Sequence, residues 1–156
     1  MFSKACEYGI RAAIHISMQS MEGQRVNLQD IVREIGTPVA FTAKILQILA
    51  KNNIIESVKG PNGGFYIKKK RLSKIFLNEI VSAIDGQSIY QGCGLGLKEC
   101  SEKFPCPLHD KFKKIRDRLK KMLENTSLYD LSMELQQGNT FLNFAHVQSK
   151  RPDKAK

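Results

Sequence analysis

The strongest constraint on the fold comes from residues 27–52, where two short amphipathic patterns follow one another closely. The first pattern begins at Asn27, which can cap a helix, and ends at Gly36. Its apolar residues share one helical stripe and are Leu28, Ile31, Val32 and Ile35. The second pattern begins at Thr37, a possible cap, and its expected inward residues are Phe41, Ile45, Ile48 and Leu49. Two short helices joined by a tight glycine-containing turn predict a helix-turn-helix.

The next stretch predicts a two-stranded hairpin. A short run from Ile54 to Val58 and a return strand beginning at Phe65 flank the turn KGPNGG, in which Asn62-Gly63 is a strong hairpin dipeptide. The basic residues 68–71 are expected at the end of the return strand. Helix, helix and basic hairpin form the pattern of a winged helix-turn-helix. The predicted fold class is therefore mainly α with a small β-hairpin wing, followed by a long dimerisation helix.

A unit of this kind places the start of its second helix in the major groove of duplex DNA. The residues expected to face the groove are Thr37, Val39, Ala40 and Lys44. At the wing, Lys59, Gly60 and Asn62 are expected to contact phosphate or the minor groove. The expected partner is a double-stranded DNA operator.

The charge of the chain agrees with a polyanionic partner. The net charge is +10, with 12 basic against 7 acidic residues in 1–90 and 13 against 8 in 91–156. A basic excess in both halves favours nucleic acid or an anionic membrane surface. No run of about 18 apolar residues is present, and the first residues lack the apolar core of an export signal. We therefore expect a cytoplasmic protein with no membrane partner, in which disulfides are disfavoured.

Residues 93–109, CGLGLKECSEKFPCPLH, predict a metal site. Six residues separate Cys93 from Cys100, five separate Cys100 from Cys106, and His109 lies three positions beyond. Thiolates select zinc, cuprous copper or iron–sulfur clusters, and an imidazole can complete such a site. Zinc is disfavoured because the usual two-residue spacing between paired cysteines is missing. The loop could also hold small buried cysteines or disulfides, but we favour an iron–sulfur cluster.

The segment after this loop predicts a long helix starting at Pro107, which suits a first helical position. Its apolar residues form a two-heptad seam: Leu108, Phe112, Ile115, Leu119 and Met122. A seam of this kind on a strongly charged helix is typical of a dimer contact, so we expect a homodimer. A last helix is expected to begin at Thr126 or Ser127, with Asp130 completing its capping pattern.

These elements suggest four parts. They are a winged helix-turn-helix domain over 1–86, a cluster-binding loop over 87–109, a dimerisation helix with a C-terminal helix over 107–144, and a disordered basic tail over 145–156. The fourth cysteine, Cys6, falls in a predicted first helix and is expected to be a small packed residue. No catalytic triad or carboxylate pair presents itself. We therefore expect neither an enzyme nor a small-molecule substrate.

The chain resembles the family of winged-helix regulators that includes the iron–sulfur sensor IscR and the nitric-oxide sensor NsrR, over roughly residues 1–135. The segments that carry the resemblance are YGIRA, the helix pair closed by LAKNNII, the wing ESVKGPNGGFYI, EIVSAIDG, the three cysteines and TSLYDL. The resemblance implies a homodimeric transcription regulator that senses redox state, nitric oxide or iron–sulfur status. The ending C-P-L-H at His109 is similar to the IscR arrangement, in which a histidine completes a two-iron two-sulfur site. A four-iron four-sulfur cluster is the other possibility.

The resemblance also implies an alternative fourth ligand. In some relatives a carboxylate from the first helix of the partner subunit ligates the cluster, and Glu7 matches that position. Two departures from IscR stand out: the spacing from Cys93 to Cys100 is one residue longer, and Ala43 and Lys44 replace the acidic-plus-amide pair of the recognition helix. Two other functions stay open, namely an iron–sulfur electron-transfer protein and a zinc-stabilised DNA-binding module without sensing.

Overall fold

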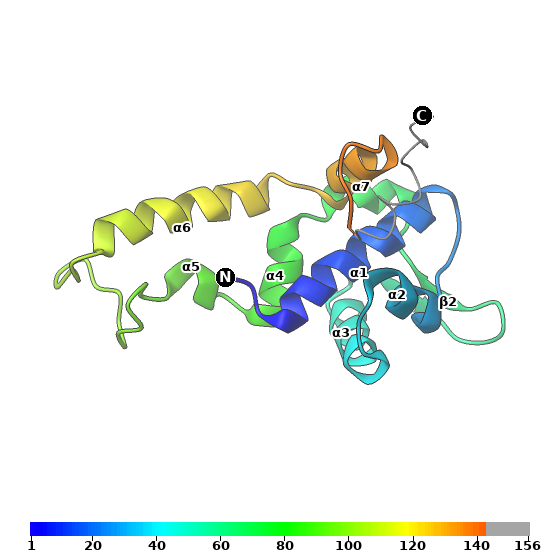
Figure 1. Cartoon of the computed structure of the whole chain (residues 1–156), viewed down its shortest axis with the longest axis horizontal. Coiled ribbons are helices and arrows are strands. Elements are labelled where there is room, and N and C mark those ends of the chain that lie inside the picture. Colours follow the sequence, from blue (N-terminus) through cyan, green and yellow to red (C-terminus); the bar gives the residue numbers. More distant parts are fainter. Residues whose placement is uncertain (143–156) are drawn as a thin grey trace, which may run out of the picture.

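The computed structural model describes residues 1–142, and helices dominate it (Figure 1). The elements in chain order are α1 (Lys4–Met21), α2 (Leu28–Ile35), α3 (Val39–Lys51), β1 (Glu56–Val58), β2 (Gly64–Tyr66), the 3-10 helix η1 (Lys69–Lys74), α4 (Leu77–Asp85), α5 (Ser88–Gln91), α6 (His109–Glu124) and α7 (Leu128–Gln136). This order confirms the predicted fold class, a mainly helical chain with a two-stranded antiparallel wing. The tail predicted to be disordered, 145–156, lies outside the described residues.

Helices α2 and α3 form the predicted helix pair. The side chain of Asn27 accepts a hydrogen bond from a backbone N–H of the first turn of α2, and Gly36 ends that helix at a left-handed φ of 64°. The prediction that Thr37 caps α3 is wrong, because the N-cap position is Pro38. The Thr37 side chain is buried instead, and its hydroxyl lies 2.7 Å from that of Thr42. A buried hydroxyl needs such a partner.

The buried side of α3 differs from the predicted one. Its buried side chains are Thr42, Ile45, Leu46 and Leu49. Phe41 was expected to face inward but is 40% exposed, and its ring packs edge-on against Tyr8 of α1 with 5.7 Å between ring centroids. Helix α3 packs against α1, α2 and α4, and these neighbours determine which of its side chains are covered.

The wing is anchored to the loop between α1 and α2. Phe65 of β2 and Val26 exchange two backbone hydrogen bonds, of 2.8 and 3.0 Å. Gly64 has a φ of 133°, and a Cβ there would lie 2.7 Å from the carbonyl oxygen of Val26, so only glycine permits this approach. The basic residues 68–71 were predicted as a strand end, but Lys68 is the N-cap of η1 and residues 69–71 belong to η1 itself.

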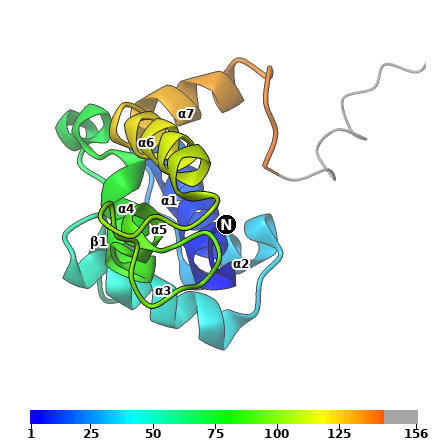
Figure 2. The ribbon, with the colours of Figure 1, turned by 90° about the vertical axis from the view of Figure 1, so that its left-hand side faces the viewer.

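Helix α1 lies at the centre of the N-terminal unit and packs against α2, α3, α4 and α7. Helix α7 begins with the predicted capping pattern, in which Ser127 and Asp130 bond reciprocally. The Ser132 hydroxyl of α7 donates to the buried Ser17 hydroxyl of α1 at 2.8 Å. Figures 1 and 2 show α5, the cysteine loop and α6 extending together from one end of this bundle. Across the part of the chain described, no helix is long and apolar enough to cross a bilayer.

Candidate DNA-binding surface and cysteine site

The first turns of α3 present three of the four residues predicted to face a groove. Val39 is 41% exposed, and Ala40 and Lys44 are exposed as well. Thr37, by contrast, is only 6% exposed, and its hydroxyl is committed to Thr42. Its predicted place on the reading surface is therefore wrong, because the turn before α3 folds it into the interior.

The wing tip exposes Lys59, Gly60 and Asn62, the three residues predicted there. An arginine that the sequence did not single out holds this tip. The Arg25 guanidinium donates to the Asn62 carbonyl at 3.2 Å and lies over the Tyr66 ring, 5.2 Å from its centroid. A lone arginine in a loop carries no sequence signal, and only the pairing of that loop with β2 brings it to the wing.

The basic run after the wing is partly engaged within the protein. Lys68 forms an ion pair with Glu56 at 3.2 Å, and Arg71 donates to the backbone carbonyl of Asn53, just after α3, at 2.6 Å. A hydrogen bond from the Tyr66 hydroxyl lowers the pKa of Glu56. Of this run, Lys69 and Lys70 are exposed at η1 and extend the basic surface beside the wing.

The loop between α5 and α6 brings the four predicted ligands together as two pairs. The sulfurs of Cys93 and Cys106 lie 3.9 Å apart, and the Cys100 sulfur lies 3.4 Å from Nδ1 of His109. The three cysteines are free thiols, each half-buried, while His109 is only 7% exposed. Among residues 1–142, no three His, Cys, Asp or Glu side chains converge as one metal-holding group. The four predicted ligands thus lie in the loop and at the first residue of α6, and they form two separate pairs.

This division bears on the kind of metal group that the loop suits. Two sulfurs bound tetrahedrally to one metal, at about 2.3 Å each, lie about 3.8 Å apart. The two sulfurs of Cys93 and Cys106 are 3.9 Å apart, and the Cys100 sulfur and the His109 nitrogen are 3.4 Å apart, a shorter separation that agrees with the shorter metal–nitrogen bond. A two-iron two-sulfur cluster takes two protein ligands on each iron, whereas a single structural zinc needs all four ligands around one point. The donor chemistry and the pairing both fit the two-iron cluster.

Backbone geometry favours the thiolate form of Cys93. The N–H of Leu95 points at its sulfur, with 3.4 Å between the atoms. The pKa of the Cys93 thiol is lowered mainly by this bond and next by a bond from the N–H of Leu97. A hydrogen bond with Cys106 and the charge of Arg116 lower it more weakly. The thiolate is the form that binds metals and reacts as a nucleophile.

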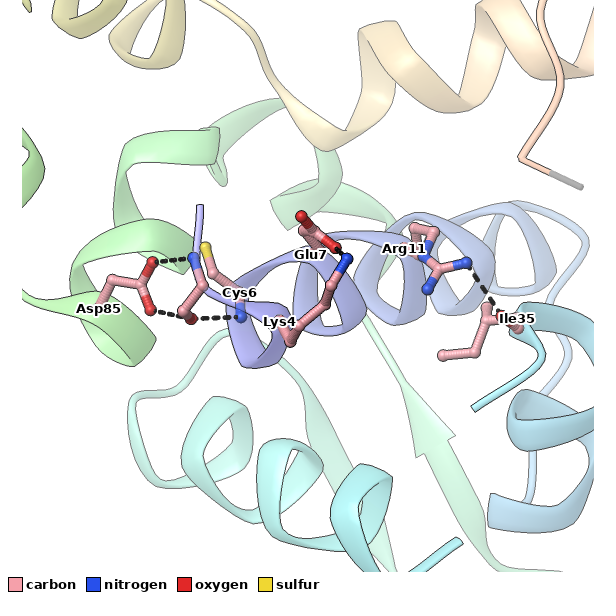
Figure 3. A network of polar contacts seen from close by, with 7 residues as sticks. Lys4, Cys6, Glu7, Arg11, Ile35 and Asp85 are labelled. Carbon is pink, nitrogen blue, oxygen red and sulfur yellow. Dashed lines mark hydrogen bonds and ion pairs between the residues drawn. The ribbon is translucent and has the colours of Figure 1, made fainter. Parts of the chain in front are cut away.

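Cys6 is in a different environment, and the prediction that it is a packed residue is confirmed. It is fully buried near the start of α1, where Figure 3 shows it turned toward Asp85 of α4. Burial, and next the charge of Asp85, raise the pKa of its thiol to about 12. Cys6 is therefore held protonated and is separate from the loop.

Glu7 lies on α1 beside Lys4, with which it forms an ion pair of 2.7 Å (Figure 3). Its side chain is 40% exposed. Within the described residues, no hydrogen bond or ion pair joins Glu7 to the loop ligands of its own subunit. Its role as a ligand from the partner subunit stays a prediction.

The predicted apolar seam of α6 is divided between different neighbours. Phe112 packs beneath the cysteine loop, since a Cβ on Gly94 would lie 2.5 Å from its ring. Leu119 packs against the core beside Leu123, a fully buried residue that the seam did not include. Ile115 and Met122 remain 60% and 46% exposed, although both are large and apolar. The exposed part of the seam is thus the pair Ile115 and Met122, and the dimer contact predicted for the seam stays a prediction.

Residues 2–134 match the family model Rrf2, described as an iron-dependent transcriptional regulator. The chain is 31% identical over 124 residues to the HTH-type transcriptional regulator IscR of Escherichia coli, covering 80% of this chain and 75% of that protein. The structure is similar to CymR, titled the global cysteine regulator of B. subtilis, with TM-score 0.68, 19% identity and coverage of 85% and 96%. It is also similar to T. potens IscR, with TM-score 0.68, 16% identity and coverage of 94% and 96%.

Proposed function

Because this chain belongs to the Rrf2 family of transcriptional regulators, we propose that it is a homodimer that binds an operator and senses through an iron–sulfur cluster. It is a regulator of transcription and not an enzyme. The proposed ligands are Cys93, Cys100, Cys106 and His109, with Glu7 of the partner subunit as the alternative to His109. A two-iron two-sulfur cluster is favoured.

The observation that carries this proposal is that the four proposed ligands lie as two pairs, Cys93 with Cys106 and Cys100 with His109, beside the start of α6. The loop places two sulfurs 3.9 Å apart, and a sulfur and an imidazole nitrogen 3.4 Å apart. When bound, an iron–sulfur cluster supplies one-electron redox chemistry at a potential set by its ligands and surroundings. The protein's own part is to hold four donors in this paired arrangement on an exposed loop.

The same residues connect the loop to the proposed dimer contact. His109 is both a proposed ligand and the first residue of α6, and its N–H donates to the Cys106 carbonyl at 2.9 Å. A change in the ligand pairs therefore displaces the start of the helix that bears the exposed Ile115 and Met122. Two copies of α6 packed through that face would set the separation of the two recognition helices. This is the two-state element that a switch requires.

On DNA, the start of α3 is proposed to read base edges through Val39, Ala40 and Lys44. The wing tip, with Lys59, Gly60 and Asn62, is proposed to contact phosphate or the minor groove. A symmetric dimer then binds a pseudo-palindrome whose half-sites lie about one helical turn, roughly 34–36 Å, apart.

The experiment that tests the whole proposal is metal analysis of anaerobically purified protein, followed by operator binding with and without the cluster. We expect iron and acid-labile sulfide in equal amounts and an operator affinity that differs between the two forms. We also expect affinity to fall steeply as salt rises, because neutralised phosphates release counterions. Stoichiometric zinc without iron, or equal affinity of both forms, would contradict the sensing proposal.

One observation favours a second candidate function, a thiol sensor without a cluster. The sulfurs of Cys93 and Cys106 would need to approach by only about 2 Å to form a disulfide. In that reaction a peroxide takes two electrons from the two thiols, an S–S bond forms and water is released. Peroxide treatment that changes operator affinity in iron-free protein, with a mass loss of two hydrogens, would favour this candidate.

The reading residues lead to a prediction with an internal control. Lys44→Ala should weaken binding to the operator by about 1–3 kcal/mol if its ammonium meets a guanine edge. Lys59→Ala should weaken binding to all sequences about equally, since a phosphate contact carries no sequence information. Lys51→Ala removes the same charge from the exposed far end of α3 and should have little effect. Fluorescence anisotropy with operator and scrambled duplexes measures all three, and an unchanged ratio for Lys44→Ala would refute its assigned role.

A further inference from the structure

We propose that Arg116 is a positioning residue that ties the cysteine loop to α6 and favours the reduced state of the cluster. The redox part of this inference rests on the proposed function, whereas the loop-holding part does not. Arg116 lies two helical turns after His109, so both side chains are on the same side of α6.

The guanidinium of Arg116 joins the two ligand pairs. Its Nη1 donates to the Gly92 carbonyl, directly before Cys93, and its Nη2 donates to the Cys100 sulfur at 3.4 Å. Cys93 belongs to one pair and Cys100 to the other. The planar fork of arginine suits two simultaneous acceptors in a way that a lysine ammonium does not.

The loop that Arg116 holds is otherwise open to solvent. Its apolar side chains Leu95, Leu97 and Phe104 are 51%, 55% and 86% exposed. Phe112, on the same side of α6, also contacts the loop, because Gly94 packs directly against its ring. A third side chain of α6, Lys113, forms an ion pair with the loop residue Glu102 at 3.7 Å, but both partners are largely exposed and such pairs contribute little.

A surface arginine could equally be a solvated charge, but its surroundings distinguish it from its neighbours. In the described part of the chain, the ion pairs of α6 are formed by Lys113 and Lys120. Arg116 is half-buried and is directed at a carbonyl and a sulfur instead of a carboxylate. That choice of acceptors is expected of a residue that organises the loop.

The charge of Arg116 should raise the reduction potential of the proposed cluster. Three thiolates and a neutral imidazole surround the proposed cluster, and one-electron reduction makes the site more negative still. A guanidinium keeps its charge at all working pH values, and hydrogen bonds to sulfur and local charge both act on the potential. Arg116 should therefore stabilise the reduced form by about tenfold, which for a one-electron couple is about 59 mV.

The test compares wild type with Arg116→Gln, Arg116→Lys and the matched control Arg118→Gln, an exposed arginine on the same helix. Two measurements are made. Anaerobic titration with dithionite, which donates one electron per cluster, reads the midpoint potential of loaded protein. The rate of trypsin cleavage at the exposed Lys98 and Lys103 measures how well the loop is held in place in iron-free protein.

Each variant has a distinct expected result. In Arg116→Gln the cluster should be reduced about tenfold less readily, and trypsin should cut the loop faster. Arg116→Lys should recover most of the potential, because the charge is kept, but not the protection, because the fork is lost. Arg118→Gln should match wild type in both measurements.

The outcomes that overturn the inference are separable from failure of the proposed function. A potential and a cleavage rate that are unchanged in Arg116→Gln would refute the inference while leaving the cluster proposal intact. A wild type that assembles no cluster would refute the proposed function and with it the redox part, while trypsin still decides the loop-holding part. Circular dichroism identifies any variant that has lost its fold, and Arg116→Lys then serves as the milder change.

Discussion

Replacing Cys93, Cys100 or Cys106 with alanine, one at a time, is expected to abolish the visible absorbance of anaerobically purified protein. Each cysteine belongs to one of the two ligand pairs, so each substitution leaves one pair with a single donor. A cluster held by an exposed loop has few other contacts to retain it. Ultraviolet–visible spectra and iron content, normalised to protein concentration, measure the loss.

Cys6→Ala is the matched control for these substitutions. It removes the same thiol from a fully buried site on α1, where burial already raises the pKa of the sulfur to about 12. Its absorbance and iron content should equal those of wild type. A triple variant of the loop cysteines that kept full absorbance would remove the basis of the sensor proposal.

The fourth ligand can be identified in the same experiment. His109→Ala should leave a cluster that is weaker or spectrally altered, because a neutral imidazole is lost while three thiolates remain. Glu7→Ala should leave the spectrum unchanged if His109 is the ligand. The reverse result would assign the position to the partner subunit and make ligation depend on the dimer.

The second large effect is expected in assembly: Ile115→Glu should convert a dimer into monomers. Ile115 is 60% exposed on α6 in the single subunit, and a two-fold dimer would bury it twice. Placing a carboxylate in such a contact costs several kcal/mol, and a loss of about 3 kcal/mol raises the dimer Kd roughly a hundredfold. Sedimentation velocity over a concentration series measures this shift.

Lys120→Glu provides the control, since it lies on the same helix and alters the net charge more than Ile115→Glu does. Its ammonium forms an exposed ion pair with Glu124 at 3.8 Å, and such pairs contribute little. It should sediment as wild type does. Wild-type protein that is monomeric throughout the series would refute the dimer proposal outright.

Local signals in the sequence predicted the order of the elements correctly, and they also supplied the set of proposed ligands. Caps at Asn27 and Ser127 and the hairpin dipeptide Asn62-Gly63 act through neighbouring residues, so local rules predicted α2, the wing and α7 correctly. The loop cysteines and His109 are close in the chain, so their spacing indicated a shared region but not their division into two pairs. Local signals of this kind need no knowledge of distant segments.

Contacts between distant elements determine which side chains are buried and which reach the wing or the cysteine loop. Thr37 is buried and Phe41 exposed because α1 and the end of α2 determine which side of α3 is covered. Arg25 reaches the wing only because its loop pairs with β2, and Arg116 reaches Gly92 and Cys100 only because the loop folds back over α6. These contacts join residues 16 to 37 positions apart. Periodicity and propensity describe a few neighbouring residues, so they could predict which residues form each element but not which elements each side chain would contact.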